Sequence, residues 1–233
     1  MKVVILAGGL GTRLGQETKL VPKPMIKIGQ DPILIHIMKI YKHFNFKEFI
    51  IAGGYKHNYI KKFFKKKIRN LNIKVINTGM KSMTGGRIYR LKKYINENQF
   101  MVTYGDGLAN INIRKLLKFH NKNKKIATIS VVRPPARWGH VTMKKNLISK
   151  FEEKNQLNEG WINGGFFVFE KKVFKYFNKF KSKDNVILEK DILPIISKNR
   201  NLIAYKHLGF WQCMDTLREK KYLIEMNKKN KAP

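Results

Sequence analysis

The chain has 233 residues, of which 43% are hydrophobic, and its 49 Lys and Arg against 15 Asp and Glu give a formal net charge of +34. This length and apolar content predict a full hydrophobic core and exclude a disordered chain, and no apolar run is long enough to span a bilayer. The one cysteine, Cys213, excludes an internal disulfide and a cysteine-based zinc cluster. We therefore expect one domain covering residues 1–233, and the short apolar start before Gly8 indicates a cytoplasmic protein without a signal peptide.

The positive charge is spread along the whole sequence. Lysine pairs and triplets recur from 61–62 and 65–67 to 220–221 and 228–229. A charge of this size favours nucleic acid or an anionic membrane as partner, but such partners are usually met by one basic tail or helix. We therefore expect a solvated basic surface, no specific nucleic-acid partner and no membrane insertion. A catalytically inactive protein that binds nucleic acid or an anionic surface is the distant alternative.

The first half of the chain alternates strand and helix patterns. Buried strands are expected at 3–7, 49–52, 73–76 and 100–104, and helices at 33–44, 59–64 and 85–94. This alternation predicts an α/β fold with a mixed, mostly parallel sheet and helices on both faces, of the Rossmann-like type. Ligands of such sheets bind beyond the carboxyl ends of the strands, so residues up to about 125 form the predicted nucleotide-binding half.

The second half has more closely spaced strands. They are expected at 126–132, 140–143, 147–151, 165–169 and 202–206, with helices at 171–180, 189–197 and 217–226.

A glycine-rich turn after the first strand predicts a phosphate-binding loop. Glycines in the segment Gly8 to Gly11 let backbone N–H groups approach phosphate oxygens, and Arg13 and Lys23 add fixed positive charge for a leaving phosphate. A Walker loop would need lysine directly after its last glycine, and a dinucleotide fingerprint would need glycine or alanine in place of Leu14. The loop therefore predicts a nucleoside-triphosphate site of another type. A plain structural turn would explain the glycines but not the two cations.

Five further segments accompany this loop in the chain, at 82–87, 104–107, 151–154, 162–167 and 209–216. With them the sequence resembles the sugar-1-phosphate nucleotidyltransferases over nearly its whole length, and within that family the branch of the glucose-1-phosphate cytidylyltransferases. The resemblance implies a glycosyltransferase-A-like variant of the α/β fold. It also implies that residues from about 126 to 233 form the half that binds the sugar phosphate.

The resemblance assigns roles to individual residues. Arg13 and Lys23 are the expected catalytic residues, and Asp106 and Asp215 the expected ligands of Mg²⁺, a hard cation that prefers carboxylate oxygens. The implied nucleotide-binding residues are Leu6, Ala7, Gly8, Gly9, Gly11, Thr12, Arg13, Lys23, Thr84, Gly85, Gly86, Arg87 and Gly105. The implied sugar-phosphate-binding residues are Gly139, Glu153, Lys154, Asn163 and Gly164.

The implied reaction joins CTP and α-D-glucose 1-phosphate to give CDP-glucose and pyrophosphate, for deoxysugars of a cell-surface polysaccharide such as O-antigen. The attacking phosphate oxygen is already an anion, so catalysis needs positioning and charge neutralisation and no general base. Another sugar phosphate, phosphorylated acceptor or nucleotide is the closest alternative. The family's long cytidylyltransferases carry an insertion where this chain has only a short lysine-rich link before 76–79. The strength of the CTP preference and the oligomeric state, a homo-oligomer being one option, therefore stay open.

Overall fold

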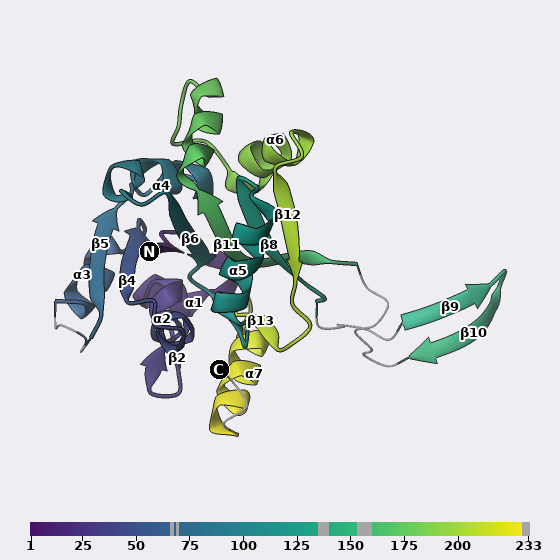
Figure 1. Ribbon diagram of the computed structural model, residues 1–233. Coiled ribbons are helices and arrows are strands. Elements are labelled where there is room, and N and C mark those ends of the chain that lie inside the picture. Colours follow the sequence, from purple (N-terminus) through teal and green to yellow (C-terminus); the bar gives the residue numbers. More distant parts are fainter. Residues whose placement is uncertain (66–67, 69, 135–139, 153–159, 230–233) are drawn as a thin grey trace.

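The computed structural model describes residues 1–65, 68, 70–134, 140–152 and 160–229. Within these residues a seven-stranded sheet forms the centre of the protein (Figure 1). Its strands, in spatial order, are β12 (Leu202–Lys206), β8 (Ala127–Val132), β11 (Ile162–Glu170), β6 (Gln99–Tyr104), β1 (Lys2–Ala7), β4 (Glu48–Gly53) and β5 (Asn72–Asn77). Neighbouring strands are parallel except at β11, which pairs antiparallel with β6 and β8. The predicted mixed, mostly parallel sheet is confirmed.

Strand β1 anchors the glycine-rich loop in the core. Val3 and Ile5 belong to the apolar cluster on one face of the sheet and Val4 and Leu6 to the cluster on the other, because successive side chains of a strand point to opposite faces. Burying one such side chain contributes about 1.5 to 3 kcal/mol. The carboxyl end of β1, directly before the glycine-rich loop, is therefore fixed by apolar packing on both faces of the sheet.

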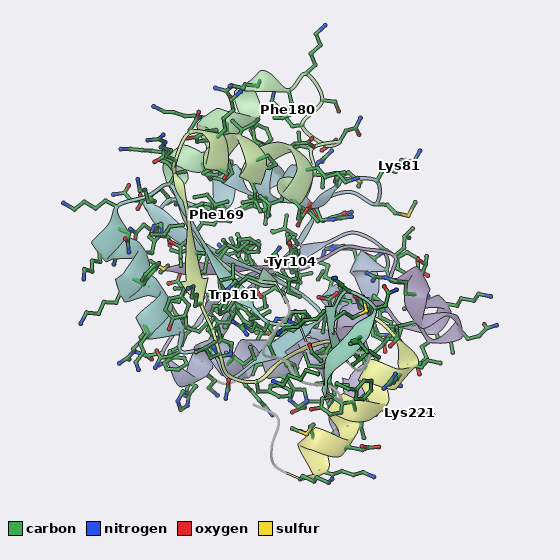
Figure 2. The ribbon with its side chains drawn as sticks, turned by 90° about the vertical axis from the view of Figure 1, so that its right-hand side faces the viewer. Lys81, Tyr104, Trp161, Phe169, Phe180 and Lys221 are labelled. Atoms are coloured by element: carbon green, nitrogen blue, oxygen red, sulfur yellow. The ribbon has the colours of Figure 1, made fainter. Side chains whose placement is uncertain are left out.

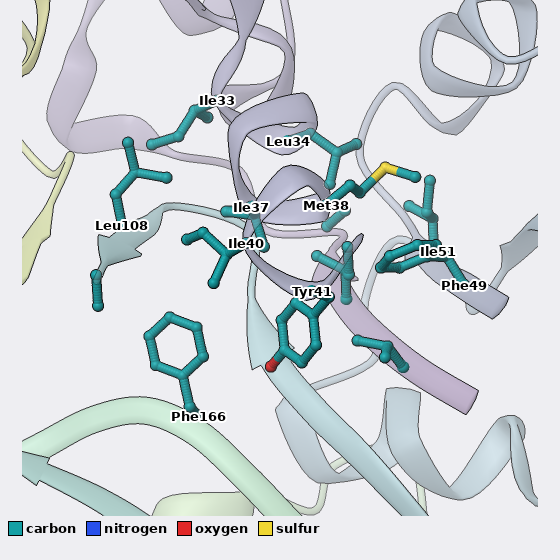
Figure 3. Close-up of a cluster of buried hydrophobic side chains, with 14 of the residues drawn as sticks. Ile33, Leu34, Ile37, Met38, Ile40, Tyr41, Phe49, Ile51, Leu108 and Phe166 are labelled. Atoms are coloured by element: carbon teal, nitrogen blue, oxygen red, sulfur yellow. The ribbon is translucent and has the colours of Figure 1, made fainter. Parts of the chain in front are cut away.

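Four helices contribute apolar side chains to the cluster that contains Val3 and Ile5. They are α2 (Ile33–His43), α3 (His57–Phe63), α5 (Ile113–Asn123) and α7 (Leu217–Lys228). In Figure 3 the α2 residues Leu34 and Met38 lie toward Ile51, while Ile37 and Ile40 lie toward Leu108. The α2 helix thereby packs against both the central sheet, at Ile51, and the segment beyond the carboxyl end of β6, at Leu108.

The other face is covered by α4 (Thr84–Arg90), a 3₁₀-helix (Lys171–Lys179), a π-helical turn (Leu188–Ile192) and α6 (Leu193–Lys198). Phe100 stacks on Phe174 with the ring centroids 5.6 Å apart. Helices on both faces of the sheet are as predicted.

Three predicted helices differ in type or length, and two α-helices, α1 (Gln16–Leu20) and α5, were not predicted. The segment 85–94 leaves the α-helix at Arg90 and continues as the 3₁₀ turn Lys92–Tyr94. The segment 171–180 is a 3₁₀-helix because Phe174 and Phe177, three residues apart, share a face in that geometry. The predicted helix 189–197 begins as the π-helical turn. Pro194 has no backbone N–H, so it cannot donate the α-helical hydrogen bond to the carbonyl four residues earlier. The α1 and α5 helices had no counterpart in the sequence prediction.

Short elements near the carboxyl ends of β1 and β6 build the candidate site. They are the 3₁₀ turns Thr12–Leu14 and Lys23–Met25, helix α1 (Gln16–Leu20), the pair β2 (Lys27–Ile28) and β3 (Asp31–Pro32), and the pair β7 (Gly107–Ala109) and β13 (Trp211–Cys213). The hairpin of β9 (His140–Lys144) and β10 (Leu147–Glu152) extends away from the rest of the protein (Figure 1). Among the described residues, no helix is long and apolar enough to cross a membrane.

Candidate active site

Lys23 lies between two aspartates that come from distant parts of the chain. Its Nζ is 2.5 Å from Asp106 Oδ2 and 2.6 Å from Asp215 Oδ1. Asp106 follows β6, and Asp215 follows β13, which pairs with β7 directly after Asp106. The backbone N–H of Met214 also donates to the carbonyl of Asp106 at 2.8 Å. This pairing holds the two predicted metal ligands on either side of the predicted catalytic lysine.

The protonation of Lys23 and of Asp215 is shifted within this cluster. Burial alone would lower the pKa of Lys23, but the charges and hydrogen bonds of Asp106 and Asp215 outweigh it and raise the pKa above its usual value. Burial would raise the pKa of Asp215, and Lys23 and Arg13 reverse this and hold it below the usual range. At neutral pH Lys23 therefore carries its positive charge and Asp215 its negative charge, which is an arrangement built around positive charge.

Arg13 completes the cluster from the solvent side. One of its guanidinium nitrogens lies 2.9 Å from Asp215 Oδ2, while 72% of its side chain is exposed. Arg13 therefore has most of its donors turned to solvent, where an anionic ligand can reach them.

The glycines of the loop make room for Lys23. Gly11 has a φ of 68°, which an L side chain rarely adopts, and a Cβ there would lie 2.9 Å from Lys23 Cβ. A Cβ on Gly105 would lie 2.8 Å from the carbonyl oxygen of Leu6 and 3.1 Å from Pro24. Glycine is therefore required at both positions for the lysine and its neighbouring proline to pass close beneath the loop.

The remaining predicted residues of the loop are either buried beneath it or exposed to solvent. Leu6 and Ala7 are buried in β1. Gly8 is also buried, and a Cβ there would lie 2.2 Å from the Arg87 guanidinium, whereas Gly9 and Thr12 are exposed and a Cβ on Gly9 would meet no atom within 4 Å. The loop thus presents open backbone next to Arg13, as a phosphate-binding loop requires.

Arg87 lies behind the loop, within the protein. It is 5% exposed, and its guanidinium donates to the carbonyls of Gly8 at 2.9 Å and Gly79 at 2.7 Å, to the hydroxyl of Thr78 at 2.9 Å, and to two further carbonyls, those of Gly53 and Met80. Burial is the main cause of its lowered pKa. The structure thus gives Arg87 contacts that hold the loop ends together, while its predicted contact with nucleotide stays a prediction.

Gly85 and Gly86 pack against the segment before the π-helical turn. A Cβ on Gly85 would lie 2.8 Å from Val186, and one on Gly86 would lie 2.5 Å from the carbonyl oxygen of Asp184. Arg90 fixes the same segment through two hydrogen bonds of 2.6 Å to Asp184. These glycines therefore have a packing reason in addition to their predicted role in reading the base.

Thr84 begins a hydrogen-bonded chain that crosses the site. Its hydroxyl donates to Glu189 at 2.7 Å, the hydroxyl of Tyr104 donates to the same carboxylate, and Asn163 Nδ2 donates to the Tyr104 oxygen at 2.9 Å. Sequence reasoning did not assign Tyr104 or Glu189 to the site. Tyr104 precedes the predicted Gly105, but nothing in the local pattern around Glu189 indicates a partner 85 residues earlier.

The sugar-phosphate residues are only partly placed. Asn163 and Gly164 lie on β11, where the Gly164 carbonyl accepts a hydrogen bond of 2.8 Å from the indole of Trp211. Gly139, Glu153 and Lys154 lie outside the described residues.

Cys213 and Glu219 lie close to Asp215, and the ligand atoms of all three fall within 4.8 Å of one another. Burial, helped by nearby carboxylates, raises the pKa of the Cys213 thiol to about 12, so the thiol is protonated at neutral pH. The Glu219 carboxylate accepts from the backbone N–H groups of Asp215 at 2.7 Å and Thr216 at 2.9 Å, as part of the cap of α7. The pair of Asp106 and Asp215 is therefore the better fit to a hard cation.

Figure 2 places Tyr104 in the interior of the molecule, while lysines such as Lys81 and Lys221 extend outward at the periphery. The large positive charge is thus carried mainly on the outside, as the spread of lysines in the sequence predicts.

Comparison with known proteins identifies the family. The nucleotidyl transferase family matches residues 2–224. The chain belongs to this family. It is 40% identical over 256 aligned residues to a glucose-1-phosphate cytidylyltransferase of Salmonella typhimurium, covering 100% of this chain and 98% of the relative. It is 39% identical over 249 residues to a probable glucose-1-phosphate cytidylyltransferase of Bacillus subtilis, covering 98% and 95%. The predicted resemblance is confirmed, and this nucleotidyltransferase is an enzyme.

Solved structures agree with this assignment. HddC from Yersinia pseudotuberculosis, complexed with GMP-PN, superposes with a TM-score of 0.76 at 26% identity, covering 97% of this chain and 99% of that one. UDP-glucose pyrophosphorylase complexed with UDP-glucose superposes with a TM-score of 0.77 at 16% identity, covering 98% of both chains, which supports the fold alone. The predicted Rossmann-like nucleotidyltransferase fold is confirmed.

Proposed function

We propose that this nucleotidyltransferase joins CTP and α-D-glucose 1-phosphate to give CDP-glucose and pyrophosphate, with Mg²⁺. The observation that carries the proposal is the convergence of Lys23, Arg13 and the two aspartates beside a glycine-rich loop that is open to solvent at Gly9. Such a site can bind polyphosphate and neutralise charge where a phosphate leaves. The choice of cytidine and glucose is supported by the names of the relatives that match the full chain at about 40% identity.

The carboxylate pair fits a divalent cation. Oxygens of Asp106 and Asp215 lie within 2.6 Å of one point, which Lys23 Nζ fills with a positive charge. Two carboxylates plus phosphate oxygens are a common ligand set for Mg²⁺. Mg²⁺ held there would neutralise negative charge on the phosphates during transfer.

The chain's own cations then have distinct tasks. We expect Arg13 to hold the outer phosphates of the nucleotide, which its mostly exposed side chain supports, and Lys23 to hold the α-phosphate. For Lys23 to do so, its ammonium must give up at least one of its two carboxylates. An oxygen of the sugar phosphate attacks the α-phosphorus as the bond from that phosphorus to the pyrophosphate oxygen breaks, and no proton has to be removed from the nucleophile.

The test is pyrophosphate release with glucose 1-phosphate and, in parallel, CTP, UTP, dTTP, GTP and ATP, all with Mg²⁺. The Lys23→Met variant tests the site. Lys39→Met is the matched control, because Lys39 lies on the exposed surface of α2 and its ammonium pairs with the Asp31 carboxylate at 2.6 Å. We expect release with CTP that is lost in Lys23→Met and retained in Lys39→Met.

Two other outcomes have clear meanings. Release with a different nucleotide, or only with another sugar phosphate such as a heptose 1-phosphate, keeps the chemistry and refutes the assigned substrates. Equal activity of the Lys23→Met variant and the wild type would refute the assigned site.

A further inference from the structure

Glu189 connects two segments that are predicted to bind different substrates. Its Oε2 accepts the hydrogen bond of 2.7 Å from the Thr84 hydroxyl, and its Oε1 accepts the one from Tyr104. The backbone N–H of Leu188 donates back to the Thr84 hydroxyl at 2.9 Å. Both oxygens of this half-buried carboxylate are therefore engaged, one toward the nucleotide side and one toward β6.

The direction of each hydrogen bond follows from the carboxylate. An ionised carboxylate only accepts, so the single hydrogen of the Tyr104 hydroxyl must point to Glu189. The Tyr104 oxygen is then left as an acceptor, and Asn163 Nδ2 donates to it at 2.9 Å. Asn163 Oδ1 in turn accepts from the backbone N–H of Gly165 at 2.8 Å. The amide of Asn163 is thus held in one orientation by a chain that starts at Glu189.

The ring of Tyr104 is fixed in the same place by the backbone of β11. Gly165 has a φ of 81°, and a Cβ there would lie 2.7 Å from the Tyr104 ring. The pairing register of β11 with β8 shifts between Asn163 and Phe167 at this point. A strand that accommodates one aromatic ring in this way indicates a site built to hold Tyr104.

We infer that Glu189 is a positioning residue that couples the two substrate sites, holding Thr84 on the nucleotide side directly and Asn163 on the sugar side through Tyr104. The inference rests on the proposed function, in which Thr84 contacts the nucleotide and Asn163 the sugar phosphate. It adds the group that orients both, and it makes the two Michaelis constants depend on one carboxylate.

The variants separate the two arms of the connection. Tyr104→Phe removes the link to Asn163 and leaves the bond from Thr84 to Glu189 in place, whereas Thr84→Val removes only the nucleotide arm. Glu189→Gln keeps the shape but replaces one acceptor oxygen with an NH₂ donor, so the remaining oxygen cannot accept from both hydroxyls and both arms are weakened. Tyr222→Phe and Glu225→Gln, on the exposed surface of α7, are the matched controls.

We expect Tyr104→Phe to raise the KM for the sugar phosphate roughly 3- to 10-fold, the size expected for one hydrogen bond, with the KM for nucleotide unchanged. Thr84→Val gives the reverse pattern, and Glu189→Gln raises both constants. Because Tyr104 and Glu189 act in one chain, the double variant Glu189→Gln/Tyr104→Phe is no worse for the sugar phosphate than the poorer single variant.

Thermal unfolding is measured on every variant, since a purely structural tie would lower the Tm of all three without a split between the two constants. That result, or additive effects in the double variant, overturns the inference. If the wild type acts on a different pair of substrates, the proposed substrates fail and the same split is measured with the active pair. If the wild type acts on none, both proposals fall.

Discussion

Replacing Lys23 with methionine is predicted to tighten the binding of Mg²⁺ to the nucleotide-free enzyme while abolishing turnover. The lysine fills the point on which oxygens of Asp106 and Asp215 converge, at 2.5 and 2.6 Å. A divalent cation and the ammonium therefore compete for the same two carboxylates. Methionine has nearly the same length as lysine without its charge, so the Lys23→Met variant removes the competitor and leaves the pocket shape.

The magnitude follows from the bonds that the cation must displace. A charge-assisted hydrogen bond contributes about 1.5 to 3 kcal/mol, and Lys23 makes two of them. After Mg²⁺ displaces the ammonium, water and the neighbouring Arg13 recover part of this free energy. We therefore take the free energy of one hydrogen bond as the net cost of displacing Lys23. The dissociation constant for Mg²⁺ should then fall roughly 10- to 100-fold in the Lys23→Met variant. In the pyrophosphate assay kcat should fall by about 100-fold or more.

Isothermal titration of Mg²⁺ into the nucleotide-free enzyme measures the affinity, and the rise in Tm with Mg²⁺ checks it independently. The Lys39→Met control removes one positive charge and one ion pair elsewhere, so it should bind Mg²⁺ as the wild type does. Adding Asp106→Asn to Lys23→Met should cancel the gain. If Lys23→Met binds Mg²⁺ no more tightly than the control, the aspartate pair is not the metal site and the reasoning is refuted.

Three further outcomes are expected. Arg87→Met removes the five hydrogen bonds of a buried guanidinium, including one of the two that the Gly8 carbonyl accepts, and should reduce the free energy of unfolding in urea by about 3 kcal/mol; an unchanged midpoint would contradict the role of Arg87 in holding the loop. Cys213, with a pKa of about 12, should react with iodoacetamide at pH 8 far more slowly than a free thiol, and labelling at the rate of a small-molecule thiol would contradict its burial. Burial lowers the pKa of His120 below its usual 6.5 despite the opposing effect of Glu170. The unfolded state therefore binds a proton more readily than the native state, and stability should fall as the pH drops from about 6.5 through the lowered pKa, a slope that His120→Gln should flatten.

The sequence was sufficient to predict the seven strands of the central sheet and the positions of their carboxyl ends. Runs such as Val3 to Ala7 are apolar on both faces, which identifies buried parallel strands, and Asp106 follows directly after one of them. The α5 helix was missed although Asn112 caps it, because lysine and asparagine fill most of its surface and leave only a narrow apolar stripe. Because most residues of α5 are polar, the sequence pattern did not indicate a helix that packs on the core through Ile113 and Leu116.

The contacts within the site were harder to predict because they join residues that are far apart in sequence. Arg87 reaches Gly8 across 79 residues, and Glu189 reaches Thr84 across 105. A motif tells which residue types are near a ligand, but it does not tell whether a guanidinium points toward that ligand or toward the backbone behind it. The Gly85-Gly86 pair illustrates this limit, since close packing of Gly85 against Val186 and of Gly86 against Asp184 requires glycine whether or not a base lies on the other side.

The two cations and the carboxylate pair of the site together predict how the metal enters. Free Mg²⁺ meets an aspartate pair whose negative charge is already offset by Lys23 and Arg13, and this disfavours its binding. A nucleoside triphosphate that carries Mg²⁺ remains an anion, so Arg13 attracts it and Lys23 can exchange its carboxylates for a phosphate. Distant lysines contribute little, because the Debye length is about 8 Å at physiological salt. We therefore expect the wild type to bind Mg²⁺ far more tightly with CTP than without it, and this dependence to shrink in Lys23→Met; equal dependence in the two proteins would show that Lys23 does not control metal entry.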